Sequence, residues 1–290
     1  MPLEMKKDRP VKTWDELQAA LYGVKVDRHN RYRSDFVYRG VADRNWHLET
    51  SLQRIGSHFA NVEVPLLRNF LKYAGPDEID SDALLYRLAL AQHHGLPTRV
   101  LDWTTSPKIA AHFATWEEKD FDKDAAIWCV DVVQARELLP PALRKKLSVE
   151  RAFVFSVEML DEFKRLAEFD DLGGEFALFF EPPSLDGRII NQGAVLSMMP
   201  GANLDMKAFL EKHDHLYERI IIPSALKWEL RDKLDQDNVT ERMLFPGLDG
   251  TSRWLKRYYG VGPNGPDARL NVNAAPNQPN TESASPPSTV

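Results

Sequence analysis

The densest run of side chains that could do chemistry extends from Gln92 to Pro107, with the sequence Gln-His-His-Gly-Leu-Pro-Thr-Arg-Val-Leu-Asp-Trp-Thr-Thr-Ser-Pro. Two histidines, an arginine, an aspartate and a tryptophan lie here between apolar residues. A histidine can act as a general base near neutral pH, and an arginine and an aspartate can hold and orient a ligand. We interpret this stretch as the floor of a site.

The two histidines fall at the end of an apolar helix that the spacing of leucines predicts over residues 82–92, with Gly95 just past its C-terminus. His93 or His94 could serve as a general base or a polar anchor. A histidine there can also bond the last free carbonyls or favour the negative end of the helix dipole. Adjacent helical residues point about 100° apart, so the pair does not readily chelate one metal, and we expect no metal site.

The next residues, 96–103, alternate as a short strand does, with Val100 and Leu101 buried on opposite faces. Arg99 and Asp102 could pair with each other or orient a ligand, and Asp102 could instead orient a histidine.

A strand-to-helix junction follows this strand. Ser106 and Pro107 suit a helix start, with the hydroxyl as cap and the proline in the first turn. Thr104, Thr105 and Ser106 would lie where free amides and the positive end of a helix favour anionic ligands. The alternative is that Thr104 and Ser106 only cap the helix.

A second candidate element is the strand predicted over residues 34–40, which ends at a glycine. Phe36 and Tyr38 share one face of it, and Val37 and Arg39 share the other. Arg39 either lies in solvent on an edge strand or projects into a cleft, where its guanidinium group would suit a phosphate or carboxylate.

Composition limits the classes of protein to consider. The formal net charge of −6 argues against a broad nucleic-acid or anionic-membrane surface. The single cysteine, Cys129, excludes an internal disulfide framework and is interpreted as a core residue. Because no apolar run is long enough to span a membrane, we expect a soluble cytoplasmic protein.

The pattern of elements predicts a single α+β domain with a mixed or mostly antiparallel sheet. Further strands are predicted over residues 124–133, 176–181 and 217–222, and a polar turn feeds another strand over 188–198. We expect a flexible N-terminus over residues 1–12, one folded domain over 13–260 and a disordered tail over 261–290.

Four stretches resemble the FRG domain in order and content. They are Phe36–Gly40, Ala91–Trp103, Arg188–Gly193 and Leu244–Gly250, and the second is the most specific. The resemblance extends over about residues 13–257, but it implies little about chemistry.

A more distant resemblance is to ADP-ribosyltransferases of the arginine–serine–glutamate type. The segments Tyr38-Arg39-Gly40 and Thr104 to Ala114 are similar to the arginine strand and the hydroxyl-bearing strand end of that family. The resemblance implies an ADP-ribosyltransferase-like fold that uses NAD as substrate. Arg39 would hold a phosphate, Thr105 and Ser106 would line the ribose, and Tyr38 or Trp103 would stack on a ring.

The same resemblance places the catalytic glutamate of that family near residues 188–194, where this chain has Gln192. An amide can bind a ribose hydroxyl but lacks the negative charge that stabilises an oxocarbenium-like transition state. Glu175 and Glu181 could replace it if the fold turns one of them into the cleft.

Three hypotheses follow from these observations. The first is an enzyme that transfers ADP-ribose or hydrolyses NAD, by analogy a toxin or an effector in defence against phage, acting on a protein or nucleic-acid target. The second is a non-catalytic module that binds a nucleotide or a nucleic-acid end through Arg39, Arg99 and Arg188. The third is a polar network that only fixes the fold. The enzyme hypothesis expects Arg39, His94, Ser106 and Gln192 to converge in one cleft.

Overall fold

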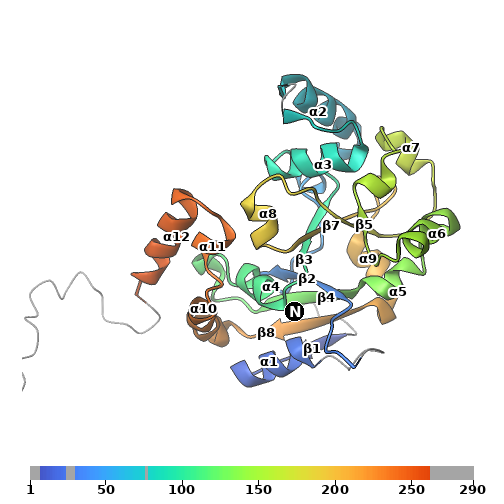
Figure 1. Ribbon diagram of the computed structural model, residues 1–290. Helices are drawn as coiled ribbons and strands as arrows, with labels where there is room; N and C mark the ends of the chain where they lie inside the picture. The colour runs from blue at the N-terminus through green and yellow to red at the C-terminus, as the bar shows by residue number, and fades with distance from the viewer. Residues whose placement is uncertain (1–6, 24–29, 76–77, 262–290) are drawn as a thin grey trace, which may run out of the picture.

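The computed structural model describes residues 7–23, 30–75 and 78–261 and places one mixed sheet at their centre (Figure 1). Within these residues the eight-stranded sheet has the order β1-β8-β4-β2-β3-β7-β6-β5. The strands are β1 (Asp8–Pro10), β2 (Phe36–Val41), β3 (Leu101–Thr104), β4 (Ala125–Asp131), β5 (Phe155–Ser156), β6 (Leu178–Glu181), β7 (Ala194–Met198) and β8 (Tyr217–Ile222). The pairs β1–β8 and β5–β6 are parallel, and the others are antiparallel. The predicted α+β class with a mixed, mostly antiparallel sheet is confirmed, while the ADP-ribosyltransferase-like form stays a prediction.

Helices cover both faces of this sheet and one side of it (Figure 1). They are α1 (Trp14–Tyr22), α2 (Phe59–Tyr73), α3 (Leu84–His93), α4 (Pro107–Ala114), α5 (Val132–Arg136), α6 (Pro141–Glu150), α7 (Leu166–Asp170), α8 (Gly187–Asn191), α9 (Met206–Lys212), α10 (Lys227–Gln236), α11 (Glu241–Leu244) and α12 (Leu248–Tyr258).

The alternation of side chains along the strands divides the interior into three apolar cores. One core extends along a whole face of the sheet and contains Val37, Leu101 and Trp103 together with α9. On the opposite face, a second core packs α1, α4 and α10 against β2, β4 and β8. The third core packs α3, α6 and α7 against β5, β6 and β7 on that same face. Between the second and third cores lies β3, whose residues on this face, Asp102 and Thr104, are polar.

Two local predictions are confirmed. Ser106 caps α4 by accepting a hydrogen bond from the amide of Ile109. Gly95 follows α3 with a φ of 82°. Its amide bonds the carbonyl of Gln92, as a C-terminal cap requires.

Two elements differ from the sequence-based expectations. Residues 8–10 form β1 inside the segment predicted to be flexible, because their backbone pairs with β8. The segment predicted as a polar turn after residue 187 is the short helix α8, which Asp186 caps through the amides of Arg188 and Ile189. Of the tail predicted to be disordered, residues 262–290 lie outside the described residues.

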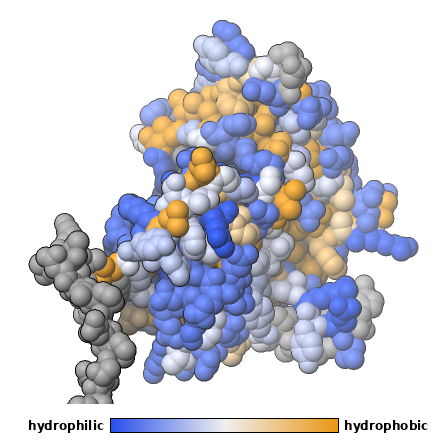
Figure 2. Space-filling model, turned by 60° about the vertical axis from the view of Figure 1, so that its left-hand side comes forward, coloured by the Kyte–Doolittle hydropathy of each residue, from blue (hydrophilic) through white to orange (hydrophobic). Residues whose placement is uncertain are grey.

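Figure 2 brings the α11 and α12 side of the molecule forward, where apolar residues gather in the upper half and hydrophilic residues dominate the lower half. Among the described residues, no helix is both long and apolar enough to cross a membrane.

Candidate functional site

The candidate site lies where the sheet opens between β2 and β3. These strands pair only through Tyr38 and Thr104, whereas β2 pairs with β4 along its whole length, from Phe36 to Val41. Beyond this one pair, the facing edges of β2 and β3 are not paired with each other, so a cavity can lie between them.

A cavity of about 720 Å³ occupies this region. That volume is within the usual range for small-molecule and cofactor sites. Its walls come from β2 and β3, from the loop that follows β2, from the C-terminal end of α4 and from α8. The residues that line it are Tyr38, Arg39, Gly40, Val41, Ala42, Asn45, Trp46, His47, Glu49, Arg54, Asp102, Trp103, Thr104, Phe113, Trp116, Glu117, Arg188, Gln192 and Ala194.

Arg39, on β2, is one of the residues that line the cavity. Its Nη1 atom donates a 2.6 Å hydrogen bond to the carbonyl oxygen of Asp102, and the carboxylate of that aspartate lies 3.9 Å away. In the described part of the chain, its Nε atom has no hydrogen-bond partner. The side chain is 21% exposed. The guanidinium group thus keeps donor capacity that the protein does not use.

The positive charge of Arg39 lies close to that of a second arginine, Arg54. Burial lowers the pKa of Arg39; the carboxylate of Asp102 opposes this effect and the positive charge of Arg54 adds to it. Arg54 is exposed and donates one 2.7 Å hydrogen bond to the carbonyl of Glu49. Two nearby guanidinium groups repel each other, and a bound phosphate or pyrophosphate would relieve this repulsion.

Aromatic rings form another wall of the cavity. Trp116 lies 4.9 Å from the ring of Phe245 and 6.1 Å from that of Phe113, between centroids. The guanidinium of Arg188 lies 4.9 Å from the ring of Phe245. Trp46, on the loop after β2, is 47% exposed. Exposed or half-buried rings in a cavity are suited to stacking on the planar ring of a ligand.

Gly40 explains how α4 reaches this position. A Cβ atom at residue 40 would lie 1.8 Å from the carbonyl oxygen of Ala110 and 2.6 Å from the amide nitrogen of Ala114. Only glycine therefore lets α4 pack this closely on β2, and this packing brings Phe113 and Trp116 to the cavity.

Gln192 lines the cavity, but the fold already uses most of its polar groups. Its Nε2 atom donates a 3.0 Å hydrogen bond to the carbonyl of Leu244, and its backbone carbonyl accepts a 2.6 Å hydrogen bond from Thr104. The neighbouring Asn191 donates to the carbonyl of Met243 at 2.7 Å. The two amides thus tie α8 to α11.

The hydroxyl segment at the start of α4 divides between the cavity and the fold. Thr104 lines the cavity, whereas Thr105 and Ser106 do not. The amide of Thr105 donates to the carbonyl of Gly193 at 2.9 Å, and Ser106 caps the helix. The capping interpretation therefore accounts for Ser106.

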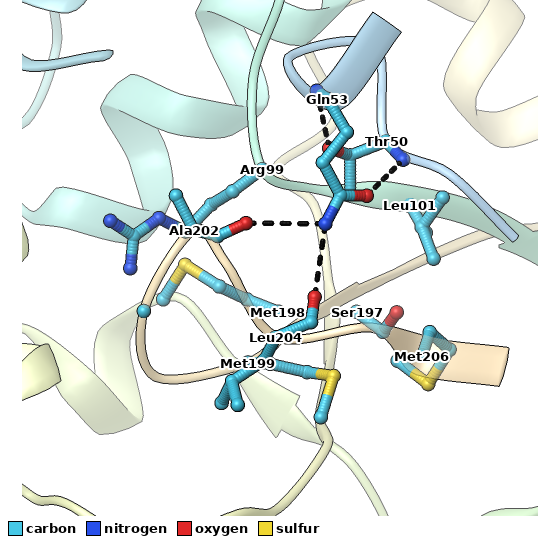
Figure 3. A pocket seen from close by; sticks show the side chains of 11 residues that line it. Thr50, Gln53, Arg99, Leu101, Ser197, Met198, Met199, Ala202, Leu204 and Met206 are labelled. Atoms are coloured by element: carbon cyan, nitrogen blue, oxygen red, sulfur yellow. Dashed lines mark hydrogen bonds between the residues drawn. The ribbon is translucent and has the colours of Figure 1, made fainter. Parts of the chain in front are cut away.

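Arg99 lies outside the large cavity. Its guanidinium is 5% exposed and forms hydrogen bonds with the carboxylates of Glu63 and Asp170. It borders a separate cavity of about 10 Å³, the size of one water molecule, and its guanidinium points away from Gln53 at the centre of that cavity (Figure 3). Arg99 is thus paired with these two carboxylates rather than with Asp102.

The two histidines also lie outside the large cavity. His94 is exposed, with its ring 6.2 Å from that of Phe70. His93 Nε2 lies 3.2 Å from a carboxylate oxygen of Asp186, the residue that caps α8. Burial lowers the pKa of His93, and the charge of Asp186 opposes this effect. His93 therefore supports α8, which carries Arg188 and Gln192 to the cavity.

The two predicted stacking residues are buried. Trp103 is 3% exposed, donates from its indole nitrogen to Ser197 at 2.8 Å and lies 5.8 Å from the ring of Phe179. Tyr38 is also 3% exposed, and burial raises its pKa to about 12. Both line the cavity, where the ring of Trp46 is exposed and that of Trp116 is half-buried.

Of the four residues expected to converge, the structure brings together Arg39 and Gln192 and leaves His94 and Ser106 outside. Glu175 and Glu181 do not line the cavity either. Its carboxylates are those of Glu49, Asp102 and Glu117.

The comparison with protein families supports the resemblance to the FRG domain. Residues 34–123 match the family model of the FRG domain. The matched segment contains β2, β3 and α4, and with them most of the lining residues, whereas Arg188, Gln192 and Ala194 come from beyond it. No curated protein and no solved structure matches the chain. The resemblance to ADP-ribosyltransferases stays a prediction.

Sequence reasoning missed several residues of the site, chiefly Trp46, Glu49, Arg54, Trp116 and Glu117. They lie in an irregular loop, in a three-residue 3-10 helix or just after a helix, where periodicity carries no signal. The available clue was that both tryptophans lie in polar segments of the sequence. The neighbouring residues of a polar segment cannot bury a tryptophan ring.

Among the described residues, no group of three or more His, Cys, Asp or Glu side chains is arranged to hold a metal ion. Cys129 is buried, in agreement with its interpretation as a core residue.

Proposed function

We propose that the cavity between β2 and β3 binds a nucleotide that carries a pyrophosphate group, with NAD as the first candidate. The observation that carries this proposal is the pair of arginines, Arg39 and Arg54, in one cavity with the exposed ring of Trp46 and the half-buried ring of Trp116. A pyrophosphate would accept hydrogen bonds from both guanidinium groups, and Trp46 or Trp116 would stack on a base. NAD is named first because of the resemblance of the arginine strand to that of ADP-ribosyltransferases.

Cleavage of the bond between nicotinamide and ribose would need a carboxylate near the positive charge that develops on the sugar. Asp102, Glu49 and Glu117 are the candidates, since Gln192 is neutral and its amide is bonded to Leu244. In this enzyme the chain would transfer ADP-ribose to a protein or nucleic-acid target or hydrolyse NAD.

A module that binds a nucleotide without cleaving it is the second candidate. It is favoured by the positions of His93 and His94, the two candidates for a general base, because neither lines the cavity.

Titration calorimetry with NAD tests the shared part of both proposals. We expect binding to the wild type, and a loss of at least tenfold in affinity for Arg39→Ala and for Arg54→Ala, because each removes charged hydrogen bonds to a phosphate. Arg144→Ala, on the far surface of α6, is the matched control and should bind NAD as the wild type does. Equal binding by all four proteins would refute the proposal.

Measuring nicotinamide release then separates the two candidates. Release that is lost in one of the three variants Asp102→Asn, Glu49→Gln and Glu117→Gln supports the enzyme. Binding without release supports the module.

A further inference from the structure

A chain of hydrogen bonds begins at Thr98, in the stretch that most specifically resembles the FRG domain. It ends on the carboxylate of Asp102 at the cavity. Thr98 Oγ1 donates to Gln92 Oε1 at 2.6 Å, and Gln92 Nε2 lies 3.0 Å from Oδ2 of Asp102. Because an ionised carboxylate only accepts hydrogen bonds, the amide nitrogen of Gln92 must face Asp102, and its oxygen then accepts from the hydroxyl of Thr98. Gln92 is thus held at its other end by a side chain that is itself 2% exposed.

These hydrogen bonds hold the carboxylate of Asp102 in one position but involve only one of its two oxygens. Within the described segments, both of the side-chain contacts made by the carboxylate involve Oδ2, from Gln92 at 3.0 Å and from Arg39 at 3.9 Å. The Asp102 side chain is 61% exposed and lines the cavity. An exposed aspartate normally samples several rotamers, so anchoring one oxygen prepares the other to bind a ligand.

An ionised carboxylate only accepts hydrogen bonds, so the ligand atom that meets it must be a donor. Arg39 lies beside it and, in the proposed function, binds a phosphate. The ligand must therefore present hydroxyl or amino groups within a few ångströms of a phosphate. The sugar hydroxyls of a ribonucleotide meet this requirement, and carboxylates bind ribose hydroxyls in this way in other nucleotide sites.

We infer that Asp102 binds a ribose hydroxyl and makes the cavity selective for ribonucleotides over 2′-deoxyribonucleotides, with Gln92 and Thr98 as positioning residues. This inference rests on the proposed nucleotide site and adds the feature of the ligand that is recognised. It also assigns a role to the geometry of the Gln92–Asp102 stretch, because the end of α3 and the strand β3 are held so that the amide of Gln92 meets the carboxylate of Asp102.

The experiment compares the affinities of the full-length protein for NAD and for two analogues of NAD. One analogue lacks the 2′-hydroxyl of the adenosine ribose, and the other lacks that of the nicotinamide ribose. We expect the wild type to bind one analogue at least tenfold more weakly than NAD, because a hydrogen bond to a charged acceptor is lost. In Asp102→Ala, NAD and that analogue should bind within about threefold of each other.

The positioning residues are tested by the same ratio, which a general loss of stability does not change as long as the protein is folded. Thr98→Val removes the hydroxyl that orients Gln92 and should reduce the selectivity several-fold. Thr98→Ser keeps the hydroxyl and should preserve the selectivity.

Each result decides a separate point. If the wild type binds NAD and both analogues equally, or if Asp102→Ala keeps the selectivity of the wild type, the inference is overturned and the proposed nucleotide site stands. If the wild type does not bind NAD, the proposed function fails and the inference fails with it.

Discussion

The Nη1 atom of Arg39 donates a 2.6 Å hydrogen bond to the carbonyl oxygen of Asp102, across the place where β2 and β3 separate. The two strands pair through a single residue pair beside this point. The bond therefore links the two halves of the sheet and at the same time fixes the direction of the guanidinium group at the cavity. The side chain of Arg39 thus joins the two strands and also contributes one positive charge to the candidate site.

A lysine at this position could not do both. Arg39→Lys keeps the positive charge, but a single ammonium group cannot bond the carbonyl of Asp102 and grip a phosphate with a planar pair of donors. We expect NAD affinity to fall about tenfold and the melting temperature to fall by a few degrees. Calorimetry and thermal unfolding measure the two effects, with Arg144→Lys as control. Unchanged affinity would show that the planar pair of donors on Arg39 is not needed to bind NAD.

A substitution at Gly40 tests the close packing of α4 on β2, which brings two lining residues to the cavity. The Cα of Gly40 lies so close to α4 that a methyl group would overlap the carbonyl of Ala110, and a backbone atom cannot move aside as a flexible side chain can. We expect Gly40→Ala to lower the free energy of unfolding by about 3 kcal/mol or more, in the range of severe overpacking.

Gly75→Ala is the control for this substitution, because its new methyl group would meet no atom closer than 3.9 Å. Denaturant unfolding compares the two variants. A Gly40→Ala variant as stable as the wild type would contradict the close packing of α4 on β2.

The sequence identified the elements of the site better than their contacts. The alternation of Phe36, Val37, Tyr38 and Arg39 predicted which side chains face which core, because a strand has a fixed period of two. Ser106 was predicted as a cap from its position before a proline, and it is one. Signals of this type are local, so one sequence is enough to read them.

Contacts between distant segments carried no such signal. Arg99 was considered as a partner of Asp102, three residues away, but it pairs with Glu63 and Asp170, which are 36 and 71 residues away. The wall formed by Trp46 and Trp116 likewise depends on a loop crossing the sheet and on the end of α4. Which of several charged residues pair is decided by packing, and neither periodicity nor capping rules describe it.

Arg99 provides a test that separates structural from ligand-binding arginines. Its removal would leave Glu63, which is 5% exposed, and Asp170 as uncompensated buried or half-buried charges. We expect Arg99→Ala to lower the free energy of unfolding by about 3–5 kcal/mol, as is typical when one partner of a buried ion pair is removed. NAD affinity, measured at a temperature where the variant is folded, should change little. A large loss of NAD affinity without loss of stability would instead show that Arg99 binds the ligand.

A buried ionic network holds the C-terminal helices to α4. Arg231 Nη1 lies 2.8 Å from Nδ1 of His112, and its Nη2 donates to Glu241 at 3.0 Å. Arg257 donates to Glu241 and to Asp235. Burial and the charge of Arg231 lower the pKa of His112 to about 3. Burial favours the protonated form of Glu241, but hydrogen bonds from Arg257 and the charge of Arg231 outweigh it and lower the pKa to about 2.

These two groups act on stability in successive pH ranges. Both folded-state values lie below the ordinary values of 6.5 for histidine and 4.5 for glutamate, so both contributions are full at neutral pH and are lost as the pH falls. The contribution of His112 begins to be lost below pH 6.5, because the unfolded chain binds a proton there and the folded chain does not. The contribution of Glu241 begins to be lost only below pH 4.5.

Between pH 6.5 and 4.5 the wild type should therefore lose on average about 1.2 kcal/mol of unfolding free energy per pH unit through His112 alone. In His112→Gln this component should be absent, because the amide oxygen can accept from Arg231 but does not titrate. Urea unfolding at intervals of half a pH unit measures the difference between the two slopes, and the effect of the other histidines cancels in it. Parallel curves for the two proteins would mean that His112 binds its proton equally well in the folded and unfolded chains, contrary to its position beside Arg231.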